Sequence, residues 1–130
     1  MRKAIQHVVI FKLNEEFQQG QLEAAVRQTA LMVEKIPGII SASFAPNAPP
    51  DLYDTYRPHT GGFTHTLLVT FTNDPMALKN YDSHPVHLEL GKLVIPFMKE
   101  AICTDSLIDT YPDDGAEHKV VPPMEKKTEG

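Results

Sequence analysis

Histidine and tyrosine side chains are concentrated in one short segment of the chain. Tyr81, His84 and His87 lie close together, and Pro85 separates the two histidines. Proline favours the first turn of a helix, so we expect Pro85 to begin a helix whose first turn contains His87. The positive end of a helix favours neutral imidazole, the form that accepts a proton. The segment therefore predicts acid–base chemistry, with His87 as general base and Tyr81 binding a substrate oxygen.

Two further histidines lie in segments typical of β-strands, His7 within residues 4–13 and His65 within residues 63–72. Because side chains alternate along a strand, His7 shares one face of its strand with Val9 and Phe11. We expect both histidines to point into the space beneath the helical segment. The predicted catalytic residues are His87 and Tyr81, and the predicted substrate-binding residues are His7, His65, His84, Val9, Phe11 and Leu67.

Each of these residues also has a purely structural interpretation. Buried histidines are usually hydrogen-bonded core residues, His84 could cap the helix that follows it, and Tyr81 could fill the core. The spacing of His84 and His87 resembles a zinc-ligand pair, but the two straddle a helix break and have no evident third ligand. We therefore predict no metal and no cofactor. Cys103 has no identifiable activating partner, so we do not expect it to act as a nucleophile.

Periodicity and turn residues predict the elements that position these side chains. Strands are expected at 4–13, 39–45, 63–72 and 101–110, and helices at 21–36, from 75 to before 85, and from 85 to about 99 unless Pro96 breaks the last one. This β-α-β-β-α-β order predicts an α+β, ferredoxin-like protomer. In that fold the first and third strands are central and the helices cover one face of the sheet.

The chain is expected to form one domain over residues 1–111, followed by a polar tail at 112–130. A long segment, 46–62, is rich in proline and ends in two glycines, which argues against regular structure there. Loops of this length often serve as lids or dimer arms, and Tyr53 and Tyr56 are placed to close over the predicted site.

Composition and charge exclude several classes of protein. The 130 residues are 42% hydrophobic and 22% charged, as in ordinary globular proteins. A net charge of −5 argues against binding to nucleic acid. No apolar stretch is long enough to cross a membrane. The single cysteine cannot form an intramolecular disulfide, which is typical of a cytoplasmic protein.

One face of the predicted sheet would carry Val8, Ile10 and Leu68 and would be exposed in a monomer. Packing against a second copy of the chain is the simplest way to cover this face, so we expect a homodimer. Cover by the long loop or by the tail is the alternative.

Three motifs resemble the stress-responsive dimeric α/β-barrel (Dabb) domain family. They are His7-Val-Val-Ile-Phe-Lys-Leu, Gly62-Phe-Thr-His65 and Tyr81-x-x-His84-Pro-x-His87, and the resemblance covers roughly residues 4–110. It implies ferredoxin-like protomers whose sheets pair into a dimeric α+β barrel. Most members resemble stress-induced proteins. The resemblance therefore implies a stress-responsive protein, which would be a homodimer with a small-molecule pocket lined by histidine and tyrosine.

The family also includes the plant olivetolic acid cyclase, which closes a linear polyketide by an aldol reaction. That member implies an alternative function, a cyclase or decarboxylase (lyase) acting on an aromatic polyketide-like acid. The implied roles are base for His87, assistance from Tyr81, and pocket histidines at His7 and His65. Aromatic residues of the cyclase's first helix are replaced here by Ala25, Val26 and Thr29, which implies a different pocket wall and substrate.

Overall fold

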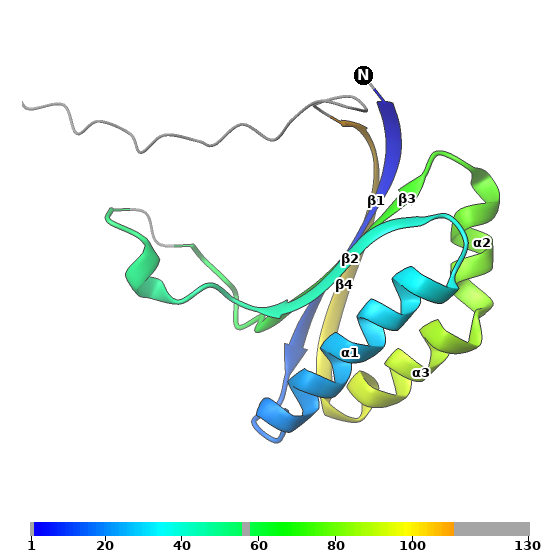
Figure 1. Cartoon of the computed structure of the whole chain (residues 1–130). Helices are drawn as coiled ribbons and strands as arrows, with labels where there is room; N and C mark the ends of the chain where they lie inside the picture. Colours follow the sequence, from blue (N-terminus) through cyan, green and yellow to red (C-terminus); the bar gives the residue numbers. More distant parts are fainter. Residues whose placement is uncertain (1, 56–57, 111–130) are drawn as a thin grey trace, which may run out of the picture.

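The computed structural model describes residues 2–55 and 58–110, which form one antiparallel sheet with helices on one face (Figure 1). The strands, in the sheet order β2-β3-β1-β4, are β2 (Ile39–Pro46), β3 (His65–Thr72), β1 (Arg2–Leu13) and β4 (Met98–Thr110). The helices are α1 (Gln19–Lys35), α2 (Pro75–Ser83) and α3 (Pro85–Val94), with short 3-10 helices η1 (Pro50–Leu52) and η2 (Ile95–Phe97). The predicted ferredoxin-like fold, with the first and third strands central, is confirmed.

The last helix was expected to reach about residue 99 unless Pro96 breaks it, and the break is observed: α3 ends at Val94, and Pro96 lies in the 3-10 helix η2. Proline ends the helix because it lacks the amide hydrogen that would continue it. The last strand was expected to begin at residue 101, but β4 already begins at Met98. Segment 46–62 contains the short helix η1, contrary to the expectation of no regular structure, and Pro46 closes β2. The predicted tail, 112–130, and Tyr56 lie outside the described residues.

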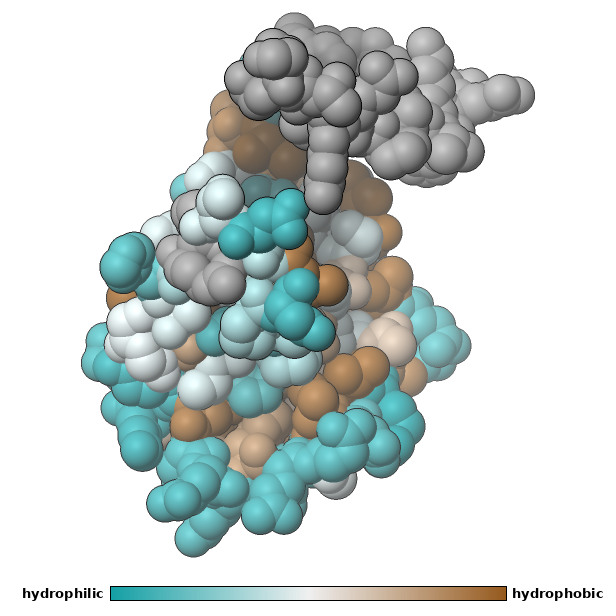
Figure 2. Space-filling model, turned by 90° about the vertical axis from the view of Figure 1, so that its left-hand side faces the viewer, coloured by the Kyte–Doolittle hydropathy of each residue, from teal (hydrophilic) through white to brown (hydrophobic). Residues whose placement is uncertain are grey.

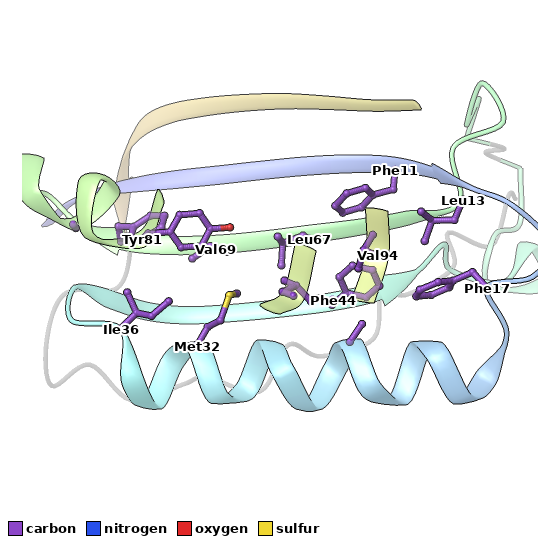
Figure 3. Close-up of a cluster of buried hydrophobic side chains, with 14 residues drawn as sticks. Phe11, Leu13, Phe17, Met32, Ile36, Phe44, Leu67, Val69, Tyr81 and Val94 are labelled. Atoms are coloured by element: carbon purple, nitrogen blue, oxygen red, sulfur yellow. The ribbon is translucent and has the colours of Figure 1, made fainter. Parts of the chain in front are cut away.

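The hydrophobic core lies between the sheet and the helices (Figure 3). Leu67, Val69 and Phe71 alternate along β3 and are buried beneath the helices. Met32 and Ile36 close the core from the side of α1. Each such side chain contributes about 1.5–3 kcal/mol when fully buried.

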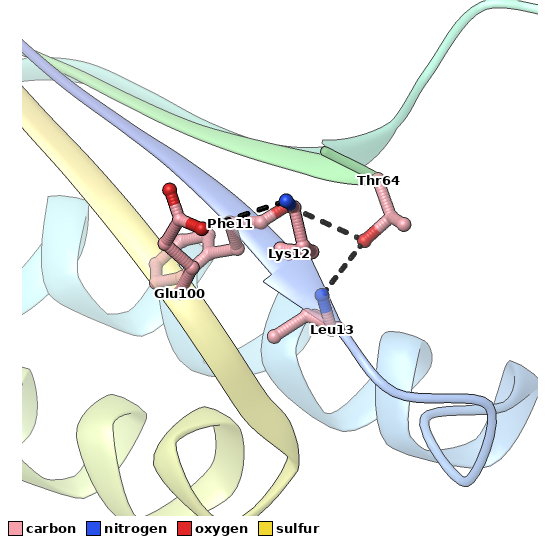
Figure 4. A network of polar contacts seen from close by, with 5 residues as sticks. All are labelled: Phe11, Lys12, Leu13, Thr64 and Glu100. Carbon is pink, nitrogen blue, oxygen red and sulfur yellow. Dashed lines mark hydrogen bonds and ion pairs between the residues drawn. The ribbon is translucent and has the colours of Figure 1, made fainter. Parts of the chain in front are cut away.

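Thr64 joins the end of β1 to the beginning of β3 (Figure 4). Its hydroxyl accepts a hydrogen bond from the backbone N–H of Leu13 at 3.1 Å and donates one to the carbonyl of Phe11 at 3.4 Å. Beside it, Lys12 pairs with Glu100 of β4 at 3.5 Å. These contacts lie at one end of the β1–β3 pair. The register of this pair places Phe11 opposite His65 and His7 opposite Val69.

The turn between α1 and β2 packs directly against α2. Gly38 has φ +96°, a conformation that glycine adopts readily, and an added Cβ would lie 2.7 Å from the Cβ of Ala77. Its carbonyl accepts a hydrogen bond from the backbone N–H of Thr72 at 2.9 Å. The close approach brings α2, and with it Tyr81, against the end of β3.

The other face of the sheet carries no helix, and hydrophobic residues (brown in Figure 2) gather on this side of the molecule. Val8 and Leu68 are half-buried, while Ile10 and Ile102 remain 36% and 46% exposed. The segment containing η1 also projects on this side, away from the helices (Figure 1). Among the described residues, none of the helices has the length and apolar character needed to cross a bilayer.

Candidate functional site

A cavity of about 240 Å3 lies between β1, α2, α3 and the start of β4. Its wall combines the polar rings of His7, Tyr81 and His87 with apolar side chains. It is lined by His7, Val9, Phe11, Leu67, Tyr81, His87, Leu90, Gly91, Val94, Ile95, Met98 and Ala101. The cavity therefore brings together six of the eight predicted site residues, from two strands and two helices.

Tyr81, in the last turns of α2, is 3% exposed, and its hydroxyl has no hydrogen-bond partner among the described residues. Figure 3 shows the hydroxyl directed along the sheet rather than toward solvent. Burial raises the pKa of Tyr81, and the neighbouring acidic groups of Cys103, Asp105 and Asp82 raise it further. The hydroxyl therefore stays protonated and is available to donate a hydrogen bond.

His87 lies in the first turn of α3 and stacks on the Tyr81 ring, with the ring centroids 3.9 Å apart. Its Nδ1 is 3.2 Å from the carbonyl oxygen of Asp82. A carbonyl can only accept, so Nδ1 carries the hydrogen and Nε2 of the neutral ring keeps its lone pair. Burial lowers the pKa of His87, although the hydrogen bond and charge of Asp82 oppose this effect. The hydrogen on Nδ1 and the lowered pKa both favour a neutral ring whose Nε2 can act as a base.

We expect His87 to titrate below pH 6.5, the ordinary histidine value, because burial disfavours its charged form. The unfolded chain then takes up a proton first, so the free energy of unfolding should fall as the pH drops below about 6.5. NMR titration of the ring can test this. A His87 midpoint at or above pH 6.5 would contradict the assignment.

His7 is held by an acidic residue that sequence reasoning missed. Its Nδ1 lies 2.6 Å from Oδ1 of Asp105 on β4, and Asp105 is the residue directly opposite it in the sheet. The ring also packs edge-on against Tyr81, with centroids 5.3 Å apart. The alternation of β4 was the signal that could have found Asp105, because residues 101, 103, 105 and 107 share the face of His7.

Cys103 lies beside the same pair, with its Sγ 3.6 Å from Nδ1 of His7. Burial raises the pKa of the Cys103 thiol, and the charge of Asp105 adds to this, so the thiol stays protonated. Among the described residues, His7, Cys103 and Asp105 could together hold a metal ion, since their ligand atoms lie within 4.8 Å of one another. The hydrogen bond between His7 and Asp105 already occupies Nδ1.

The structure places two predicted substrate-binding residues away from the cavity. The Nδ1 of His84 accepts a hydrogen bond from the backbone N–H of Val86 at 3.1 Å, so His84 caps α3. His65 shares a sheet face with His7 but lies four residues further along the paired strands, about 13 Å away at the usual rise per residue. Its ring packs edge-on against Phe17, with centroids 5.0 Å apart.

The cavity wall comes from α3 rather than from α1. Ala25 and Thr29 are buried residues of α1, and neither these nor Val26 line the cavity. The family resemblance implied that these three positions change the pocket wall, but they do not form the wall of this cavity. Tyr53 of the long loop does not line it either. None of the described residues of the loop lines the cavity, and the segment containing η1 lies toward the open face of the sheet.

Gly91 lies inside α3 and lines the cavity, and an added Cβ would make ordinary contact with Ile95 at 3.4 Å. We expect Gly91→Ala to stabilise the protein by about 0.5–1 kcal/mol, because alanine favours the helix more than glycine does. We also expect it to narrow the cavity, because the added methyl group would lie in the cavity wall. Thermal unfolding and ligand titration test this. Gly20→Ala in α1 is the matched control, since nothing lies within 4 Å of its added Cβ. Equal ligand binding by both variants would contradict a role for Gly91 in the wall.

Comparisons with known proteins agree with this architecture. The chain is similar over 83% of its length to a crystal structure of At3g17210 from Arabidopsis thaliana, with 98% of that chain covered, 17% identity and a TM-score of 0.65. It is also similar to a hydroxynitrile lyase from Passiflora edulis, over 86% of this chain and 100% of the other, with 19% identity and a TM-score of 0.65.

A dimeric protein of unknown function from Bacteroides fragilis, described as having a ferredoxin-like fold, is 20% identical, with a TM-score of 0.62, over 81% of this chain and 96% of the other. At these identities the likeness concerns the fold. Compared by sequence with curated proteins, the chain matches none. The sequence pattern of the stress responsive A/B barrel domain, however, matches residues 5–108. The chain therefore belongs to the stress responsive A/B barrel domain (Dabb) family.

Proposed function

We propose that the chain binds a small molecule in the cavity and makes or breaks a carbon–carbon bond next to a carbonyl group by acid–base catalysis. The observation that carries this proposal is the buried Tyr81 hydroxyl, which has no hydrogen-bond partner among the described residues. A buried group without a partner costs about 1–3 kcal/mol. A ligand oxygen in the cavity would provide the missing acceptor.

The proposed reaction uses His87 as the base and Tyr81 as the hydrogen-bond donor. Nε2 of His87 takes the proton of a substrate hydroxyl, and the electron pair left on oxygen forms the carbonyl as the adjacent carbon–carbon bond breaks. The leaving carbon takes the proton back from His87. Tyr81 stabilises the negative charge that develops on oxygen, and the reverse sequence is an aldol-type closure.

His7 is proposed to orient the substrate. Since the carboxylate of Asp105 accepts from Nδ1 at 2.6 Å, Nε2 of His7 is left as an acceptor. A substrate hydroxyl would donate a hydrogen bond to this Nε2, next to the ring of Tyr81. Cyclisation, decarboxylation and cyanohydrin cleavage would use the same groups. The hydroxynitrile lyase with this fold supports the lyase class in general.

The test is a ligand-observed NMR screen of small aldehydes, ketones and cyanohydrins, followed by turnover assays of the molecules that bind. His87→Ala should abolish turnover and weaken binding. His59→Ala is the matched control, because His59 is an exposed histidine of the long loop. Equal activity of the two variants would contradict the assignment of His87 as the base.

A non-catalytic stress protein is the second candidate, favoured by the modest size of the cavity. Its volume of about 240 Å3 lies below the ~300–1,000 Å3 of most small-molecule sites. On this alternative, no small carbonyl compound would bind, while the protein would remain a stable dimer throughout the screen.

We also propose a homodimer formed through the open face of the sheet. Val8, Ile10, Leu68 and Ile102 give this face an apolar centre, and several structures with the same fold are described as dimeric. Two sheets packed in this way would form the α+β barrel for which the family is named. The single, unpaired cysteine supports a cytoplasmic location.

A further inference from the structure

The described residues that line the cavity include no lysine or arginine. The one lysine of α3, Lys92, pairs with Glu89 at 3.5 Å and lines an adjoining groove, which shares His87, Gly91 and Ile95 with the cavity. Lys12 on β1 pairs with Glu100 and lies next to Phe63. The described wall of the cavity therefore has no lysine or arginine to pair with an anionic ligand, and Lys92 next to it already pairs with Glu89.

Negative groups, by contrast, surround the polar end of the cavity. Asp105 lies directly behind His7, with 2.6 Å between its Oδ1 and the ring Nδ1. After burial, neighbouring acidic groups that include Asp105 and Asp82 raise the pKa of Tyr81. The same carboxylates that oppose an anion on Tyr81 would oppose an anionic group of a ligand bound to it.

Burial adds to this effect. Val9, Phe11, Leu90 and Val94 make much of the remaining cavity wall apolar. A carboxylate entering the cavity would lose its water and find the Tyr81 hydroxyl as a donor but no opposite charge. An uncharged carbonyl oxygen would lose far less hydration and would gain the same hydrogen bond.

We propose that the cavity selects uncharged carbonyl compounds, or the uncharged hydroxyl adducts that release them, and excludes carboxylates. This inference rests on the proposed function and specifies its substrate class. It replaces the carboxylic acid implied by the family resemblance. It also separates the candidate reactions, since decarboxylation needs a carboxylate substrate whereas aldol-type cleavage and closure do not.

Matched ligand pairs test the proposal by NMR titration of the full chain at pH 7.5: benzaldehyde against benzoate, and 2-heptanone against heptanoate. The neutral member of each pair should bind at least tenfold more tightly. If the carboxylates bind equally or better, the charge selection is overturned and the cavity remains a ligand site. If no member of either pair binds, the proposed function fails as well.

A gain-of-function variant tests the cause. Met98 lines the cavity and is 39% exposed, so a lysine there can keep its amine near water while its charge reaches the cavity. Met98→Lys should bind benzoate at least tenfold more tightly than the wild type. Leu52→Lys adds the same charge at a 69% exposed position of η1, outside the cavity, and should not. Equal benzoate binding by the two variants would overturn the electrostatic explanation.

Discussion

Tyr81→Phe should unfold at a higher temperature than the wild type and yet lose activity by about 100-fold or more. Both effects follow from the Tyr81 hydroxyl, which is buried without a hydrogen-bond partner among the described residues. Removing it relieves a desolvation cost of about 1–3 kcal/mol. It also removes the donor for the developing oxyanion, a loss typically worth 100- to 1,000-fold in rate. Thermal unfolding and turnover by the same preparation measure both effects.

Thr29→Val is the matched control, because its buried hydroxyl has a partner. Oγ1 of Thr29 donates to the carbonyl of Ala25 at 2.7 Å, and the residue lies outside the cavity. This variant should lose about 0.5–1.5 kcal/mol of stability while retaining its activity. A Tyr81→Phe protein that is less stable than the wild type and fully active would contradict the interpretation of Tyr81 as a ligand-binding group.

Leu68→Asp should convert the proposed dimer to a monomer. Leu68 lies opposite Val8 at the centre of the open sheet face, so the substitution would bury an unpaired carboxylate in the interface. A penalty on the order of 3–5 kcal/mol corresponds to a rise of at least about 100-fold in the dimer dissociation constant. Sedimentation or light scattering over a concentration series measures the shift.

Val26→Asp provides the corresponding control on the opposite side of the molecule. Val26 is an exposed residue of α1, so the variant adds the same charge to a helix surface and should leave the oligomeric state unchanged. If Leu68→Asp remains dimeric at low concentration, the interface lies elsewhere and the apolar residues of the open face have another role.

Most of the fold could be predicted from the sequence because alternation and proline positions are local signals. The strand of residues 63–72 alternates apolar and polar side chains, and the structure buries one set beneath the helices. Pro85 marks the start of α3, which places His87 in its first turn. The end of α3 was harder, because the chain continues through a 3-10 turn that shares the apolar character of the helix.

The site was less predictable, since it depends on distance along the strands and not only on face. His7 and His65 share a face, but antiparallel pairing places His65 opposite Phe11 and next to Phe17. Asp105 was missed because the partner of His7 is set by the register of β1 with β4, which is a long-range feature. Tyr81 and His87 were found together because one short segment contains both.

The cavity divides its two kinds of wall between different parts of the chain. His7, Tyr81 and His87 come from β1, α2 and the beginning of α3, whereas Leu90, Val94 and Ile95 come from the later part of α3 and from η2. On the proposed function, substitutions in this later part would reshape the space for a substrate while the polar groups keep their positions. A few changes in α3 and η2 would then give one set of acid–base groups a new substrate.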